Sequence, residues 1–207
     1  MKKAAIIAIL SILFLAFTII SIVASKQKAS VPVKLSNSGW VTGNPRSKVT
    51  LTEFGDFQCP ACKLFEPIMR QMRTSYGSKV KIVFKHFPLK SVHPNAMAAA
   101  KAAEAAGNQG KFWEYHDLLY DNQELWAGQT DPTDKFLEYA QQLKLDTELF
   151  KKDLQDKKFD DKINAQEDEG ITVGVSGTPT IYVGGKFLGV PSGYDDLKKE
   201  VDAALSK

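Results

Sequence analysis

Two cysteines, Cys59 and Cys62, stand three positions apart, and the chain has no others. The residues before them, 49–54, are typical of a strand, and those after them are typical of a helix. The free N–H groups and the dipole at a helix start stabilise a thiolate there, and a second thiol one turn later can close a disulfide with it. This arrangement predicts a redox centre where the strand meets the helix.

A zinc site and a structural disulfide are the alternative uses of such a pair. Structural zinc needs about four ligands, and beyond the cysteines the chain adds only His86, His93 and His116 from the usual soft donors. A disulfide across so short a loop removes little entropy from the unfolded chain. We therefore expect redox exchange without a metal or any cofactor beyond the Cys59–Cys62 disulfide, and we expect the histidines to be structural.

A second motif lies far downstream at Thr178 and Pro179. It precedes two strand-like runs, 181–183 and 186–188, which flank a Gly-Gly turn and predict a β-hairpin. A proline at the first residue of a strand is unusual. Spacing alone leaves open whether its peptide bond is cis, presenting the preceding backbone to a docking partner, or is an ordinary trans bond.

Taken together, residues 53–62 and 177–180 resemble the DsbA-like branch of the thioredoxin superfamily, and its membrane-anchored bacterial members most closely. The resemblance covers about residues 40–205. It implies that Pro179 is cis and faces the disulfide, and that Thr178 contacts the substrate. Pro67, eight positions after Cys59, also matches a proline of thioredoxin-like proteins.

The expected fold is α/β: a thioredoxin fold with an inserted helical domain, preceded by an N-terminal transmembrane signal anchor. Strands at 48–54 and 79–87 flank a helix at 60–76 in a right-handed βαβ unit. A helical insertion at about 91–170 includes an alanine-rich helix at 96–106 that we expect to stop at Gly107 and Gly110. A hairpin and a helix at 194–205 complete the domain, which spans 41–207.

The N-terminus sets the expected compartment. After Lys2 and Lys3, residues 4–24 carry no charge, long enough to cross a bilayer as a helix. We interpret residues 1–25 as an uncleaved signal anchor, with a cleaved signal peptide as the alternative. Residues 26–40, rich in serine, predict a polar tether. Both interpretations place the domain outside the cytoplasm, where a disulfide persists: either on a single-pass membrane protein, or secreted or periplasmic after cleavage.

Each site residue has an expected role. Cys59, at the helix start, is expected to be the exposed nucleophile, and Cys62 the more buried resolving thiol. Pro60 suits the first helical position because its missing N–H costs nothing there. The resemblance implies that Ala61 replaces a histidine of the enteric type, which makes the pair less oxidising.

Glu53 lies on the strand that leads to the cysteines, where thioredoxin-like proteins carry a buried acid. Such a carboxyl would have a raised pKa and could relay the proton of Cys62. An exposed strand glutamate is the alternative. In some relatives a lysine pairs with this acid, and the resemblance offers Lys85 for that role.

These observations predict an extracytoplasmic oxidoreductase that introduces disulfides into reduced secreted or surface proteins, and that acts as a monomer. The family implies reoxidation by a quinone-linked membrane partner of the DsbB or vitamin-K-epoxide-reductase kind. A thiol reductase using the same residues, and a non-enzymatic binding or chaperone module, remain alternatives. The net charge of +3, without a basic stripe, argues against a nucleic-acid partner.

Overall fold

The computed structural model describes residues 32–207. The predicted anchor, residues 1–25, and residues 26–31 of the predicted tether lie outside this part. Within residues 32–207, no helix combines the length and the apolar character needed to span a bilayer.

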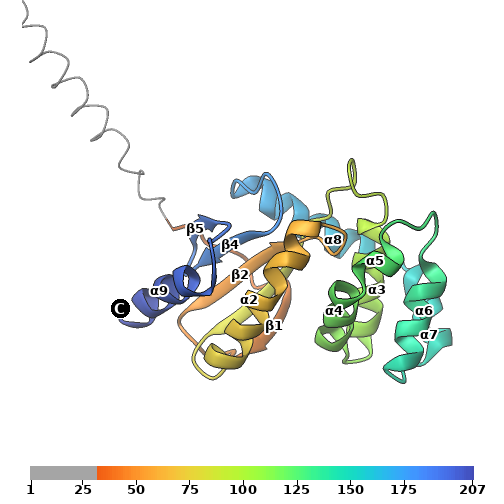
Figure 1. The fold of residues 1–207 in the computed structure, drawn as a ribbon, viewed down its shortest axis with the longest axis horizontal. Helices are drawn as coiled ribbons and strands as arrows, with labels where there is room; N and C mark the ends of the chain where they lie inside the picture. The colour runs from red at the N-terminus through yellow and green to blue at the C-terminus, as the bar shows by residue number, and fades with distance from the viewer. Residues whose placement is uncertain (1–31) are drawn as a thin grey trace, which may run out of the picture. The chain divides into compact units, whose positions relative to one another are not determined.

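A five-stranded sheet forms the centre of the domain (Figure 1), in the order β1-β3-β2-β4-β5. β2 and β3 run parallel, and every other neighbouring pair is antiparallel. The predicted βαβ unit and the predicted hairpin are therefore both present. The strands are β1 Trp40–Gly43, β2 Thr50–Gly55, β3 Lys81–His86, β4 Thr180–Val183 and β5 Lys186–Gly189.

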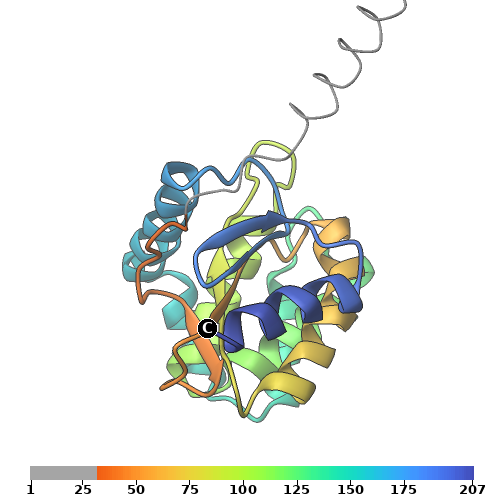
Figure 2. The same ribbon diagram turned by 90° about the vertical axis from the view of Figure 1, so that its left-hand side faces the viewer.

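Helix α2, Pro60–Tyr76, crosses from β2 to β3 and carries Pro67 inside it, as the sequence predicts. Its buried side chains Phe65, Met69 and Met72 belong to one apolar cluster with side chains of the sheet. Helix α9, Tyr194–Leu205, adds Leu197 and Val201 to the same cluster. Figure 2 shows α9 and α2 side by side along the sheet. This packing fixes the start of α2 at the end of β2.

Six helices lie between β3 and β4, where the sequence predicts the insertion. Figure 1 shows α3, α4, α6 and α7 gathered at one end of the sheet. Helix α3 runs through Gly107, where we expected it to stop. A Cβ atom on Gly107 would lie 2.2 Å from the Trp40 ring, so the glycine permits close packing there. The bounds are α3 Ala96–Asn108, α4 Phe112–Asp121, α5 Gln123–Trp126, α6 Thr133–Gln142, α7 Thr147–Leu154 and α8 Lys157–Thr172.

The two faces of the sheet bury different side chains. Side chains alternate along β2, so Leu51, Glu53 and Gly55 share one face, which we call the Glu53 face. Leu51 packs there with α2 and α9. The opposite side, the Phe54 face, packs Phe54 against Phe87 and Tyr182, with α8 passing over it at Gly170.

Residues 32–38 lie against the domain, although the sequence predicts a tether at 26–40. The N–H of Val33 donates to the carbonyl oxygen of Gly185 at 2.9 Å. The ammonium of Lys85, fully buried, donates to the hydroxyls of Ser36 and Ser38, both at 2.9 Å. Ser36 and Ser38, which suggested a tether, therefore form hydrogen bonds with a buried charge. Trp40, the last residue of that prediction, begins β1.

Candidate active site

Cys59 occupies the N-cap position of α2, and Cys62 lies one turn inside the helix. Both are free thiols. Cys62 is 0% exposed, but Cys59 is only 6% exposed, so the expectation of an exposed nucleophile is wrong in degree. The neighbours Pro60 and Ala61 are the exposed residues of the motif. Cys59 is thus almost fully covered in the reduced protein.

The surroundings of Cys59 favour its thiolate. A hydrogen bond from the Cys62 thiol is the largest cause that lowers its pKa, to about 5. The Thr178 side chain and the backbone N–H groups of Cys62 and Ala61 lower it further, while burial opposes them. These donors are the free N–H groups of a helix start together with one thiol and the side chain of Thr178. Cys59 is therefore ionised near neutral pH.

Thr178 and Pro179 reach Cys59 from the start of β4. Their peptide bond is cis, as the resemblance implied. The Cys59 thiol donates to the carbonyl oxygen of Thr178 at 3.3 Å, a contact that belongs to the protonated form. The Thr178 hydroxyl is buried and has no hydrogen-bond partner among the described residues. It is free to donate to the thiolate, so we assign to it the side-chain effect on the pKa of Cys59.

Cys62 and Glu53 lie behind Cys59 and are held neutral. Burial raises the pKa of Cys62 well above its ordinary value, and the nearby thiolate of Cys59 adds to this. Glu53 is 2% exposed, so the alternative of an exposed glutamate is wrong. Burial raises the pKa of Glu53 to about 8, and the charge of Glu66 contributes.

Lys85 does not pair with Glu53. Glu53 is in register with Phe84, and Phe54 with Lys85, so the lysine points to the Phe54 face. It binds Glu169 there at 2.5 Å. The predicted Glu53–Lys85 pair is therefore wrong, because the two side chains lie on opposite faces of the sheet.

Buried amides hold the loop before Cys59 against the inserted helices. The side chain of Gln123, in α5, donates to the carbonyl oxygens of Phe57 and Cys59 at 2.7 and 3.0 Å. Gln58 donates to Ala127 and accepts from the N–H of Asn95, both at 2.7 Å. Glutamine and asparagine are usually exposed, so the sequence offers no signal for these contacts.

The three histidines each pair with a carboxylate. His93 contacts Asp56, three residues before Cys59, at 2.7 Å. His86 contacts Glu104 at 3.0 Å, and His116 contacts Asp117 at 2.9 Å. None of these contacts joins a histidine to a cysteine, and the structural role of the histidines stays a prediction.

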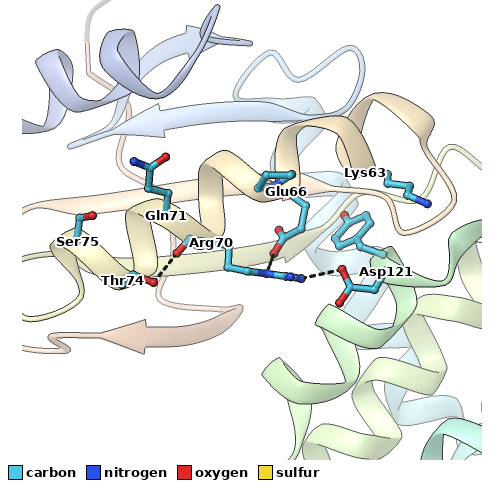
Figure 3. A pocket seen from close by; sticks show the side chains of 9 residues that line it. Lys63, Glu66, Arg70, Gln71, Thr74, Ser75 and Asp121 are labelled. Carbon is cyan, nitrogen blue, oxygen red and sulfur yellow. Dashed lines mark hydrogen bonds and ion pairs between the residues drawn. The ribbon is translucent and has the colours of Figure 1, made fainter.

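A groove of about 470 Å³ opens between α2 and α4 (Figure 3), lined by Glu66, Arg70, Tyr120 and Asp121 among others. Glu66, with His116 and Asp117, could offer three ligand atoms within 4.8 Å of one another. However, the guanidinium of Arg73 lies 2.8 Å from both Glu66 and Asp117. A cation already neutralises these carboxylates, so the group does not fit a metal ion.

Residues 36–203 match the family model described as thioredoxin. Over 170 residues the chain is 32% identical to a protein of Bacillus cereus named probable disulfide bond formation protein D, covering 80% of this chain and 78% of that protein. The crystal structure of oxidised BdbD from Bacillus subtilis superposes with a TM-score of 0.76 and 24% identity. It covers 87% of this chain and 100% of that one.

Other relatives are much longer than this chain. A protein of Salinispora arenicola named Na(+)/H(+) antiporter NhaA 1 is 43% identical over 146 residues, which is 70% of this chain. The chain spans only 22% to 24% of the first three curated relatives, all named as antiporters of this kind. In those proteins the shared part is one segment of a larger chain.

Proposed function

This chain belongs to the family whose model is described as thioredoxin, and we propose that it is a DsbA-like thiol-disulfide oxidoreductase that oxidises thiols of reduced secreted or surface proteins through Cys59 and Cys62. The thiolate environment of Cys59 is the observation that carries this proposal. A disulfide whose reduced form is stabilised as a thiolate is a strong oxidant, because reduction releases that stabilisation.

In the proposed reaction a substrate thiolate attacks the Sγ atom of Cys59 in the oxidised protein. The Cys59–Cys62 bond breaks, and a mixed disulfide joins the substrate to Cys59. A second substrate thiolate then attacks the substrate sulfur. It forms the substrate disulfide and releases Cys59 as its stable thiolate.

Thr178 and Pro179 are the substrate-binding residues of this proposal. The Thr178 carbonyl oxygen lies 3.3 Å from the Cys59 sulfur, within reach of a peptide bound there. An extended substrate can pair with this backbone as an added strand. Pro60 and Ala61, both exposed, form the other side of the approach.

The reduction potential of the domain tests the direction of electron flow. Equilibration with glutathione should give a value well above about −200 mV, the range of oxidants, while a value near about −270 mV would identify a thioredoxin-like reductase instead. Reduced, unfolded ribonuclease should regain its disulfides with the oxidised protein. Cys59→Ser should abolish this turnover, and a chaperone would instead retain its binding activity in that variant.

We propose that residues 4–24 anchor the domain outside the cytoplasm and that a quinone-linked membrane protein reoxidises it. The uncharged run after Lys2 and Lys3 supports the anchor, and an oxidant that ends each cycle reduced requires an electron acceptor. Fractionation of cells tests the location. The full chain should resist salt extraction from membranes and be digested by external protease, whereas a soluble mature form beginning near Lys26 would show cleavage.

A further inference from the structure

A polar cavity of about 200 Å³ opens on the Phe54 face of the sheet. Thr50 and Thr52 of β2 line it, in register with Lys81 and Val83 of β3, so all four side chains share that face. Strand β2 begins at this cavity and runs toward Cys59. The cavity and the cysteines therefore lie at opposite ends of the same strand.

Residues 33–37 and the turn between β4 and β5 provide most of the remaining lining. The N–H of Val33 donates to the carbonyl oxygen of Gly185. A Cβ atom on Gly185, whose φ is +81°, would lie 2.2 Å from the carbonyl oxygen of Val33, so only glycine fits there. The ammonium of Lys81 donates to the side-chain oxygen of Asn37 at 3.3 Å. Specific contacts thus hold the segments that bound the cavity.

The charge at this cavity is positive. Among the described residues, its charged lining groups are Lys48 and Lys81, and no carboxylate lines it; we call it the lysine cavity. Residues 33–52 and 77–87, the segments to which the two lysines belong, contain no aspartate or glutamate. Glu169, an acid of α8, already binds a different lysine. An anion between the two ammonium groups would be stabilised by both of them.

The donors of the lysine cavity match the oxygen atoms of a phosphate group. Lysine ammonium groups are common phosphate ligands, and threonine hydroxyls donate to the same oxygens. Thr52 is 2% exposed, so an anion that reaches its hydroxyl is shielded from water. The cavity is smaller than the roughly 300–1,000 Å³ of pockets for drug-sized ligands, which suits a small anionic group.

We propose that the lysine cavity binds the phosphate of an anionic phospholipid headgroup. Its place in the chain selects this source. The uncharged run at residues 4–24 ends nine residues before Val33, and an extended chain of that length spans at most about 30 Å. Lysines near an anionic lipid surface are attracted to it. The choice of a lipid rests on the proposed anchor, whereas the phosphate site rests on the cavity alone.

Acetylation of lysines by an uncharged reagent, quantified by mass spectrometry, measures access to the lysine cavity. The full chain is placed in vesicles of phosphatidylcholine alone, or of phosphatidylcholine mixed with phosphatidylglycerol. Phosphatidylglycerol should slow the acetylation of Lys48 and Lys81 about fivefold, the factor for one lysine contact with an anionic lipid surface. Lys79, exposed and outside the cavity, should be little affected.

Three results would overturn the proposal. Equal slowing of Lys48, Lys81 and Lys79 would show general attraction to the lipid surface rather than a site. Slowing by inorganic phosphate added to the neutral vesicles, without an effect of phosphatidylglycerol, would exclude the lipid as the source. Slowing by neither would exclude the phosphate site itself.

Thr52→Val tests the site without changing charge. The phosphatidylglycerol content that half-protects Lys81 should rise about fivefold, the factor for one lost hydrogen bond. Lys48→Gln should raise it about fivefold as well, and Lys79→Gln is the matched control that should leave it unchanged. All three variants should keep the rate of exchange with dithiothreitol, because the cysteines lie at the other end of β2. Equal protection in all three variants would contradict the proposal.

The anchor and the phosphate site fail separately. If salt releases the unsubstituted chain from neutral vesicles, the proposed anchor fails, and protection of Lys48 and Lys81 by phosphatidylglycerol still decides the phosphate site. If the chain stays in the vesicles and neither lysine is protected, only the phosphate site fails.

Discussion

Removing the Cys62 thiol should raise the pKa of Cys59. The hydrogen bond from Cys62 is the largest cause of the shift from 9.0 to about 5. In Cys62→Ala the backbone donors and Thr178 remain, so we expect a value between these limits. A rise to about 7 would cut the thiolate fraction at pH 6 from about 90% to about 10%.

The lowered pKa of Cys59 also makes the stability of the reduced protein depend on pH. The pKa of Cys59 is lower in the folded protein, so its contribution is fully present above about pH 9 and is lost as the pH falls to about 5. At pH 7 the folded thiol is about 99% ionised and the unfolded thiol about 1%, which stabilises the reduced protein by about 2.7 kcal/mol. The reduced form should therefore resist denaturant better than the oxidised form.

Thiolate absorbance, followed from about pH 3 to pH 10 in the reduced protein, measures the pKa of Cys59 directly. Cys62→Ser is the matched control, because its hydroxyl keeps a donor at the same position and should hold the pKa nearer to 5. Cys59→Ser should remove the titration. A pKa near 9 in the unsubstituted protein, or an identical value in Cys62→Ala, would refute the argument.

Three further variants test the surrounding packing. The pKa of Glu53 is about 8 in the folded protein, so its ionisation destabilises the fold as the pH rises. Glu53→Gln removes this effect, and the gain in free energy of unfolding in urea should be larger at pH 8 than at pH 4.5 by up to about 4 kcal/mol. An unchanged pH profile would contradict this. Gly107→Ala should cost about 1–3 kcal/mol in thermal unfolding, since its methyl meets Trp40. Lys85→Met should cost about 3–5 kcal/mol, because Glu169 loses its cation and keeps only its hydrogen bonds from Ser36 and Ser38, and it should expose residues 32–38 to protease, with Lys90→Met as a surface control.

Local patterns predict the chemical centre and most elements. Cys59 and Cys62 after a strand, Pro67 inside α2, and the Gly184-Gly185 hairpin all depend on neighbours in sequence, and the structure contains each. β1 was not predicted, because it has only four residues and its apolar side chains, Trp40 and Val41, are adjacent in the sequence. Its existence depends on pairing with β3, about forty residues away in the chain.

Contacts between distant elements are what the sequence cannot supply. The face on which Lys85 lies follows from the strand register, and a shift of one position would place its side chain on the opposite face. Cys59 forms hydrogen bonds with Thr178 and Gln123, which lie far along the chain.

The arrangement also explains why the two thiols of one short motif have pKa values shifted in opposite directions. Cys59 sits at the helix end, where free N–H groups and the Cys62 thiol stabilise negative charge. Cys62, one turn later, belongs to the apolar cluster that the inserted helices form with Phe57 and Phe84, where burial disfavours charge. After the disulfide is reduced, Cys59 therefore remains a thiolate, whereas Cys62 binds a proton and becomes a neutral thiol. An acid beside Cys62 is needed for that second step, and Glu53, neutral near pH 7, is placed to provide it.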